Sequence, residues 1–292
     1  MPEACEVRCI SISLNGKLSG KILTSIEFDD KSKYRNGLPS YEEFKEFLPC
    51  TITGVTCKSK CIIFLCSSNN KQIFITSTLG LEGKWTVGDK PFSKHSNLWF
   101  NLEDEEGNNQ KAYFTDTRHF GNIKLHLNLN DLSRKLSKIG IDYLLYAISI
   151  KEDFEIQDHE KIPYDLWYET AISPRWKYKQ ICSFLMEQGV FSGIGNYLKA
   201  EILYRARIRP NRPICELRKD ELKLIYKCIF DIIYESFMAG GLTIKTFWDP
   251  DGNIGTFKKV VYDQKTDPLG NPVVKDKFSD GRTTHWVKEV QI

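Results

Sequence analysis

The hydrophobic pattern changes near residue 131, and this change most limits the folds open to the chain. Before it, short apolar runs such as 61–66 (CIIFLC) and 72–76 (QIFIT) are separated by polar breaks, which is typical of β-strands. After it, apolar residues recur at helical spacing, most clearly over 219–241. We therefore predict an α+β protein with a β-rich first part and a helical second part.

Both ends of the chain show further patterns. A helix is expected from about Glu3 to Asn15-Gly16, since glycine commonly ends a helix. From Thr256 onward, β signals return over 256–263, 271–277 and 282–290, and turn sequences separate them. The tail is therefore expected to contain a β-hairpin.

Composition excludes several classes of protein. The 292 residues are 41% hydrophobic and 27% charged, which is ordinary for a folded soluble protein. No apolar run is long enough for a transmembrane helix, and the N-terminus does not read as a signal peptide. The nine cysteines are scattered without a CxxC pair. We expect reduced thiols in an intracellular protein, with no zinc-ligand spacing and no membrane partner.

Charge alone does not identify a partner. The net charge of +3 is too small to mark a nucleic-acid binder. The stretch 205–212 (RARIRPNR) has four arginines and no acid, which suits phosphate. On charge alone, a solvated helix end is the better reading of this stretch.

A Gly-Ile-Gly-Asn turn at 193–196 precedes a helical stretch. Glycine permits positive φ and close backbone approach, and the following helix start offers unpaired N–H groups. With Asn196 as a candidate N-cap, the turn could form a phosphate site. A tight corner between two helices would explain it equally well.

The context of this turn resembles a known family. The stretch 185–210 (LMEQGVFSGIGNYLKAEILYRARIRP) resembles the helix–two-turn–helix signature of the formamidopyrimidine-DNA glycosylase / endonuclease VIII family, including the helix glutamate at Glu201. The N-terminal Met-Pro-Glu-Ala-Cys-Glu-Val, 57–65, 79–83, 114–121 and the C-terminal hairpin sequence resemble the same family in the right order. Cys5 departs from the family's usual proline.

The resemblance implies a fold. It implies an N-terminal β-sandwich preceded by a helix over 1–145, a linker over 146–171, a helix–two-turn–helix domain over 172–250 and a finger hairpin over 251–292. Bacterial members hold a four-cysteine zinc site in the finger, but residues 256–292 contain no cysteine. The chain therefore resembles the zincless-finger Nei-like branch, and we predict no metal and no cofactor. We expect the finger to pack on the following side chains: Phe257, Tyr262, Val273 and Trp286.

The resemblance also implies catalytic residues. Removal of Met1 would give Pro2 a free secondary amine, which could form a Schiff base at C1′ of the sugar. Glu3 could protonate the ring oxygen, Glu6 could orient the amine, and Lys60 could reach into the site. From the residues alone, Pro2 reads as a helix N1 residue, Glu3 as a first-turn acid and Glu6 as part of a solvated face, and Lys58 rivals Lys60.

The remaining implied roles concern DNA. Asn196 and the backbone N–H groups at Gly195 would bind phosphates, and Arg282 would do so from the hairpin tip. A flipped base leaves a gap, which the family fills with three side chains that match the following positions: Leu81, Arg118 and Phe120. Leu81 stands where methionine is more usual, and packing alone would also explain each position.

We therefore expect a bifunctional DNA glycosylase and AP lyase of base excision repair, probing damaged DNA held between its two domains. Oxidised pyrimidines are the expected substrates, with formamidopyrimidines in addition. We expect the protein to be a monomer that acts inside the cell, at the DNA. Three alternatives stay open: an inactive DNA-binding protein of the same fold, a hydrolytic glycosylase without lyase activity, and a helical protein-interaction module.

Overall fold

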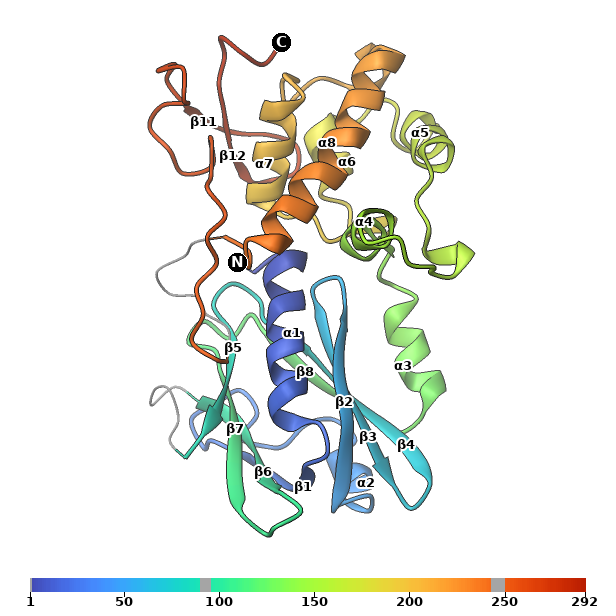
Figure 1. The fold of residues 1–292 in the computed structure, drawn as a ribbon, viewed down its shortest axis with the longest axis vertical. Coiled ribbons are helices and arrows are strands. Elements are labelled where there is room, and N and C mark those ends of the chain that lie inside the picture. The colour runs from blue at the N-terminus through green and yellow to red at the C-terminus, as the bar shows by residue number, and fades with distance from the viewer. Residues whose placement is uncertain (1, 90–95, 243–249) are drawn as a thin grey trace. The chain divides into compact units, whose positions relative to one another are not determined.

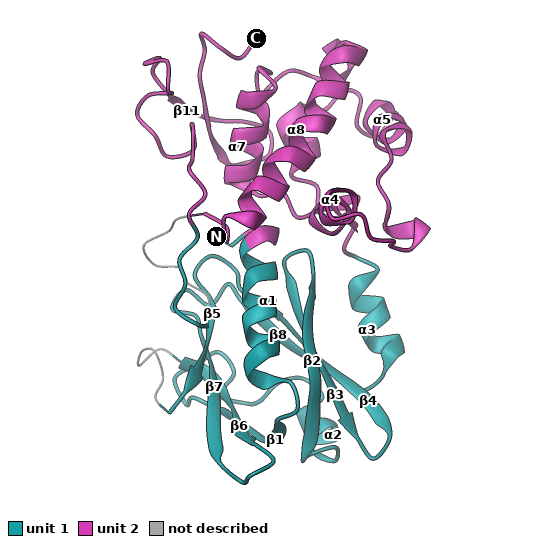
Figure 2. Cartoon of the chain, in the orientation of Figure 1, with its two compact units in different colours: residues 1–2, 6–138, 243–255 teal, residues 3–5, 139–242, 256–292 magenta. Residues whose placement is uncertain are grey.

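The computed structural model describes residues 2–89, 96–242 and 250–292, which form two compact units (Figure 2). Unit 1 comprises the described residues of 1–2, 6–138 and 243–255. Unit 2 comprises the described residues of 3–5, 139–242 and 256–292. A short N-terminal segment therefore belongs to the C-terminal unit, which the sequence did not predict. Within the described ranges, no helix combines the length and the apolar character that a membrane crossing requires.

Unit 1 is built on eight antiparallel strands (Figure 1). Their order across the sheet is β5-β7-β6-β1-β2-β3-β4-β8. The strands are β1 (Ile22–Phe28), β2 (Cys50–Lys58), β3 (Cys61–Ser68), β4 (Lys71–Thr78), β5 (Lys84–Gly88), β6 (Ser96–Glu103), β7 (Asn109–Thr115) and β8 (Asn122–His126). Two short helices, α2 (Tyr41–Lys45) and α3 (Leu129–Leu136), accompany them.

The two halves of this sheet pack face to face as a β-sandwich, as predicted. Trp85 of β5 lies with its ring centroid 5.0 Å from that of Phe64 in β3 and 4.9 Å from that of Phe100 in β6. Its indole Nε1 donates to Ser77 Oγ in β4 at 2.9 Å, so the buried polar atom is satisfied. Both halves thus contribute to one apolar core.

Helix α1 (Ala4–Leu18) closes this core with buried apolar side chains such as Leu14 and Leu18. The helix continues past the predicted end at Asn15-Gly16, because Gly16 has open space around it and is tolerated within the helix. The Asn15 side chain accepts a hydrogen bond from the Val55 N–H at 2.8 Å. Gly20, with φ of +86°, makes the turn instead.

Unit 2 is mainly helical (Figure 1). Its elements are β9 (Ile141–Asp142), α4 (Tyr143–Lys151), η1 (Asp158–Glu160), α5 (Tyr164–Ile172), α6 (Ile181–Leu185), β10 (Phe191–Ser192), α7 (Asn196–Arg205), η2 (Ile214–Glu216), α8 (Lys219–Met238), β11 (Val274–Lys277) and β12 (Thr283–Trp286). Helices α4, α5 and α7 pack on the long α8. The segment 146–171, predicted as a linker, contains most of α4 and all of α5 except its last residue, Ile172.

The hairpin tail forms from β11 and β12, which pair antiparallel with Lys277 opposite Thr283. Residues 256–263 form no strand, although one was predicted there. Their backbone is used differently: the N–H groups of Val260, Val261 and Tyr262 donate to the Glu201 carboxylate at 2.9, 3.0 and 2.8 Å. This segment is therefore held by a side chain of α7 rather than by a neighbouring strand.

Candidate active site

The Glu3 side chain ends at the N-terminus of α7. Its carboxylate accepts the N–H of Gly195 at 2.5 Å and that of Tyr197 at 2.9 Å. The N–H groups at a helix start have no partner within the helix and carry partial positive charge, so they stabilise a carboxylate there. Glu3 is only 1% exposed, and this arrangement fixes its position.

The Gly-Ile-Gly-Asn turn exists in this form because Glu3 needs the space. A Cβ on Gly195 would lie 2.2 Å from Cδ of Glu3, closer than atoms can approach. Gly193 has φ of +117°, and its carbonyl accepts the N–H of Ala4 at 3.2 Å. The turn thus binds the start of α1, and the Gly195 N–H, predicted for phosphate, is donated to Glu3 in this structure.

Asn196 is the first residue of α7, and Gly195 rather than Asn196 occupies the N-cap position. The Asn196 amide Nδ2 donates to the Thr283 carbonyl at 2.8 Å. This hydrogen bond connects α7 to the start of β12, directly beside Arg282. The Asn196 side chain also forms a hydrogen bond with Tyr262, so both N–H donors of its amide have partners within unit 2 in this structure.

Pro2 and Glu6 flank the buried Glu3 in the chain. Pro2 is buried and precedes α1, which starts at Ala4, so Pro2 is not the N1 residue of that helix. Glu6 is 1% exposed, which excludes the solvated face considered for it. Cys5, at the position where the family has proline, donates its thiol to the Ile233 carbonyl of α8 at 3.3 Å. The cysteine at this position thus joins the first residues of α1 to α8 by a hydrogen bond.

Lys60 lies in the two-residue turn between β2 and β3 and is half-buried. Ser59, the other turn residue, has φ of +54°. The rival Lys58 has its Nζ 3.5 Å from the Leu136 carbonyl at the end of α3. Lys58 is therefore directed to α3, and the turn position distinguishes Lys60 from it.

The three side chains predicted to fill the gap in DNA come from two loops of unit 1, 79–83 and 116–121. Leu81 is half-buried, whereas Phe120 is 59% exposed. The Arg118 guanidinium lies 5.3 Å from the Phe120 ring centroid. Gly80 (φ +61°) keeps the loops together, because a Cβ there would lie 2.5 Å from the backbone N of Gly121. The structure therefore brings this cluster to one exposed surface.

Two acids shape these loops and were missed in the sequence. Asp116 is 1% exposed and accepts the N–H groups of Arg118 at 3.2 Å and Gly121 at 2.6 Å. Glu82 accepts the Thr117 hydroxyl at 3.0 Å and lies 3.7 Å from the Arg118 guanidinium. An Asp side chain often accepts the N–H of the residue two positions later and so forms a turn. This local pattern could have identified Asp116 as a turn residue from the sequence.

The arginine-rich stretch 205–212 is largely used within unit 2. Arg205 forms a bidentate pair with Glu235 at 2.6 and 2.8 Å, and Arg212 forms one with Glu221 at 2.8 and 3.1 Å. Arg209 lies over the Trp286 ring, 5.1 Å from its centroid. Three of the four arginines thus have partners within unit 2, so this stretch is neither a bare phosphate-binding stripe nor the solvated helix end that its charge alone favoured.

Tyr262 is a further polar residue near Glu3 that was expected only as a packing residue. Burial raises the pKa of its hydroxyl, and the negative charge of Glu3 raises it further, while a hydrogen bond with Asn196 lowers it. The hydroxyl is therefore protonated at neutral pH. It can donate a hydrogen bond beside the carboxylate.

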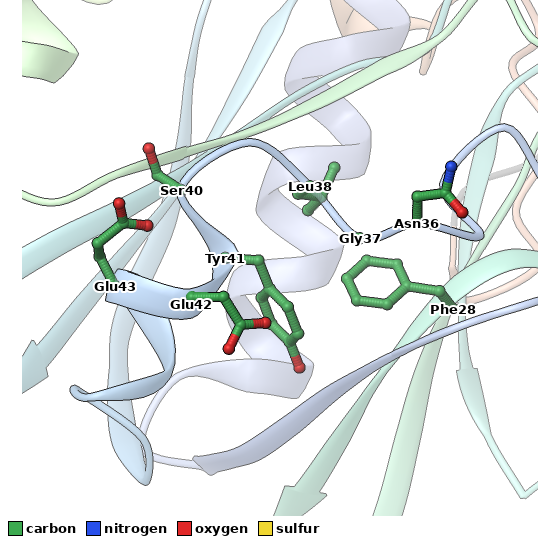
Figure 3. A pocket seen from close by; sticks show the side chains of 8 residues that line it. All are labelled: Phe28, Asn36, Gly37, Leu38, Ser40, Tyr41, Glu42 and Glu43. Carbon is green, nitrogen blue, oxygen red and sulfur yellow. The ribbon is translucent and has the colours of Figure 1, made fainter.

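Unit 1 also contains a hollow away from these residues (Figure 3). Its lining consists of Phe28, Asn36, Gly37, Leu38, Ser40, Tyr41, Glu42 and Glu43. Two neighbouring carboxylates disfavour a phosphate-bearing ligand, and none of the predicted site residues lies here. Among the described residues, no group of three or more His, Cys, Asp or Glu side chains could hold a metal ion.

Comparison with known proteins defines the class. Family models described as the formamidopyrimidine-DNA glycosylase N-terminal, H2TH and C-terminal domains match residues 1–123, 168–248 and 248–292. The formamidopyrimidine-DNA glycosylase of Rickettsia africae (strain ESF-5) is 30% identical over 301 residues, covering 100% of this chain and 99% of the relative. The enzyme of that name from Exiguobacterium sp. (strain ATCC BAA-1283 / AT1b) is 28% identical over 299 residues, with 100% and 99% coverage.

Solved structures agree with this. A complex between the Lactococcus lactis Fpg and abasic-site DNA superposes with a TM-score of 0.80 at 26% identity, covering 99% of each chain. A complex of the same enzyme with DNA containing an oxidised pyrimidine superposes with a TM-score of 0.79 at 26% identity, again covering 99% of each chain. These matches place the chain among the DNA glycosylases of base excision repair. Within that class, it belongs to the formamidopyrimidine-DNA glycosylase family.

Proposed function

We propose that this protein is a bifunctional DNA glycosylase and AP lyase that excises oxidised bases, with oxidised pyrimidines as main substrates and formamidopyrimidines in addition. The observation that carries the proposal is the Glu3 carboxylate, buried at the start of α7 directly after Pro2. A carboxyl group fixed next to a potential secondary amine provides an acid and a nucleophile for the same sugar.

The chemistry begins with the Pro2 nitrogen, once Met1 is removed. An α-amino group has a pKa of about 8, so a useful neutral fraction exists at pH 7. The amine attacks C1′, and the base leaves with its bonding electrons. The proton of the amine passes to the Glu3 carboxylate, which delivers it to the ring oxygen. The sugar opens to an iminium ion (Schiff base) between C1′ and the proline nitrogen. Loss of the C2′ proton then expels the 3′ phosphate, and a second elimination expels the 5′ phosphate.

Residues of each unit support this chemistry. Lys60 acts on a phosphate or in proton transfer from the β2–β3 turn, and Glu6 orients the Pro2 amine. Asn196 and Arg282 bind DNA phosphates from unit 2. Leu81, Arg118 and Phe120 fill the gap left by the flipped nucleotide, with Arg118 bonding the orphaned base.

We further propose that the chain belongs to the zincless-finger, Nei-like branch and acts as a monomer, without metal or cofactor, wherever the cell or virus holds its DNA. The absence of cysteine from residues 256–292 supports the branch, because the bacterial finger needs four of them. The complex of a related enzyme with DNA containing an oxidised pyrimidine supports the proposed lesion class.

Borohydride trapping tests the proposal directly. Borohydride reduces an imine to a stable amine, so protein incubated with a duplex containing thymine glycol or an abasic site is expected to give a covalent adduct. The adduct should disappear in protein whose Pro2 amine is blocked by an N-terminal tag, and Pro2→Gly protein is measured alongside. Mass spectrometry should confirm Met1 removal in the native protein. Cleavage of the abasic-site strand is measured in parallel.

Three results would redirect the proposal. Lesion binding without base release or adduct would indicate an inactive DNA-binding protein. Base release without strand cleavage or adduct would indicate a hydrolytic glycosylase. Failure to detect salt-dependent binding to DNA would indicate a helical protein-interaction module.

A further inference from the structure

A lysine and an aspartate form an ion pair in the interior of unit 2. The ammonium group of Lys199, in α7, contacts the Asp280 carboxylate in the turn between β11 and β12. Their side chains are 0% and 2% exposed. Neither residue was singled out in the sequence, because 81 positions separate them.

A fully buried ion pair is a costly way to join two elements. Removing two charges from water costs several kcal/mol per ion, and apolar residues of similar size often stabilise a protein equally well or better. Such a pair does define one geometry, because either charge is strongly unfavourable without the other.

Asp280 connects the pair to Arg282. One carboxylate oxygen contacts Lys199, and the other accepts the Arg282 N–H at 3.0 Å. Gly281, between them, has φ of +71°, which lets the turn close. The pair thus fixes the backbone from which the Arg282 side chain projects, and Arg282 itself is exposed.

Further hydrogen bonds hold the tip segment, residues 278–283. The Ser279 N–H donates to Oε1 of Gln180, the N-cap of α6, at 3.0 Å. The Thr283 carbonyl accepts from Asn196 at 2.8 Å. Bonds from α6 and α7 therefore flank Arg282 on both sides, and the ion pair lies between them.

We propose that the buried Lys199–Asp280 pair is the positioning device for Arg282 and determines whether this arginine can bind a DNA phosphate. The inference rests on the proposed function, in which Arg282 binds DNA. Lys199 and Asp280 are positioning residues, since they act through Arg282.

The test removes both charges at once, so that no unpaired charge is left buried. The variant is Lys199→Met/Asp280→Ala, and the matched control is Arg212→Met/Glu221→Gln, which removes another ion pair of unit 2 (side chains 19% and 8% exposed). Arg282→Ala and the triple variant Lys199→Met/Asp280→Ala/Arg282→Ala complete a cycle. Circular dichroism and thermal melting establish that each variant is folded.

Affinity for a duplex with a tetrahydrofuran abasic analogue is measured over a range of salt concentrations. Lys199→Met/Asp280→Ala is expected to bind about tenfold more weakly, with a salt slope smaller by about one, as for loss of one phosphate contact. Arg282→Ala should show the same loss, and the triple variant should bind no more weakly than Arg282→Ala. The control should bind like the unaltered protein.

Two affinity results would overturn the inference. A folded Lys199→Met/Asp280→Ala variant with unchanged affinity would show that Arg282 needs no such support. A further tenfold loss in the triple variant, beyond Arg282→Ala, would show that the pair acts on DNA binding by another route.

Hydrogen exchange separates this inference from the proposed function. Amides of the tip segment, Arg282 above all, should exchange faster in Lys199→Met/Asp280→Ala, while α7 and α8 keep their protection. Unchanged exchange at Arg282 would refute the positioning role even if the unaltered protein binds no DNA. Faster exchange in a protein that binds no DNA would refute only the proposed function.

Discussion

At the scale of single residues, Gly195 shows most directly how local sequence serves the site. Glycine-rich turns before helices are usually considered for their affinity for phosphate. Here the N–H groups of the turn meet a carboxylate of the chain's own N-terminus, and the missing side chain gives Glu3 its place. The motif lies at the start of α7, as the sequence indicated, but the partner of its N–H groups in this structure is Glu3.

Gly195→Ala is expected to displace Glu3, because the new Cβ would lie 2.2 Å from its Cδ. Displacement of a reacting group by about 1 Å can reduce the rate about 100-fold, so we expect a loss of that order in base excision under single-turnover conditions.

Gly189→Ala is the matched control for this variant. Its Cβ would lie 3.1 Å from the mobile end of Glu187, which can move aside, and activity should be retained. Full activity in Gly195→Ala would show that the position of Glu3 does not limit the reaction.

At the scale of elements, periodicity predicted α8 well, and the turn signals located the β11–β12 hairpin. The segment 256–263 was less predictable: its apolar residues suit a strand, but Glu201 takes the N–H groups that a strand partner would need. The same reason hides the Lys199–Asp280 pair. Such interactions depend on which elements meet in space, and local patterns do not encode that.

Helix α8 begins with a capping arrangement that makes stability depend on pH. The Glu221 carboxylate accepts the Arg218 N–H at 2.7 Å and pairs with Arg212. The Arg212 hydrogen bond and charge lower the pKa of Glu221 below its ordinary value of 4.5. The folded state thus binds this proton less tightly than the unfolded state, so the stabilisation is present above pH 4.5 and is lost as pH falls through the folded pKa.

Glu221→Gln keeps an oxygen for the Arg218 N–H but removes the charge that pairs with Arg212. We expect it to lower the free energy of unfolding by about 1 kcal/mol at pH 7, since Arg212 is partly solvent-exposed. Urea unfolding at pH 7 and pH 3 provides the measurement. The difference in the free energy of unfolding from the unaltered protein should shrink at pH 3. An equal difference at both pH values would contradict the assignment of the lowered Glu221 pKa to its pair with Arg212.

At the scale of the whole molecule, the two units carry different parts of the proposed activity. Unit 1 presents the loops 79–83 and 116–121, and unit 2 holds Glu3, Asn196 and Arg282. The chain crosses between units within its first residues, so Pro2 and Glu3 are neighbours in sequence but members of different units. The division of roles matches the order of the sequence motifs and could be anticipated, whereas this crossing could not.

Phe120→Ala is expected to separate the activity on duplex from that on single-stranded DNA. The exposed ring is proposed to wedge between base pairs, and only a duplex offers such a stack. We expect kcat/KM on a duplex lesion to fall about tenfold, as loss of one buried aromatic contact suggests, with little change on single-stranded substrate.

Tyr178→Ala provides the control for this variant, because Tyr178 is an aromatic residue of unit 2 that is 71% exposed. It should leave both activities unchanged. Equal losses on both substrates in Phe120→Ala would argue against a wedge and for a structural role of the ring.

The buried Lys199–Asp280 pair has a consequence for hybrid proteins in which the C-terminal tail comes from a relative. Replacing the tail of this chain with a cysteine-bearing finger from a relative would remove Asp280 and leave the Lys199 ammonium buried without its carboxylate. Such a hybrid should fold poorly until Lys199 is replaced as well. Helix α7 and the tail are therefore coupled through one buried ion pair, and an exchange of the tail with a relative is expected to succeed only when the residue at position 199 is exchanged with it.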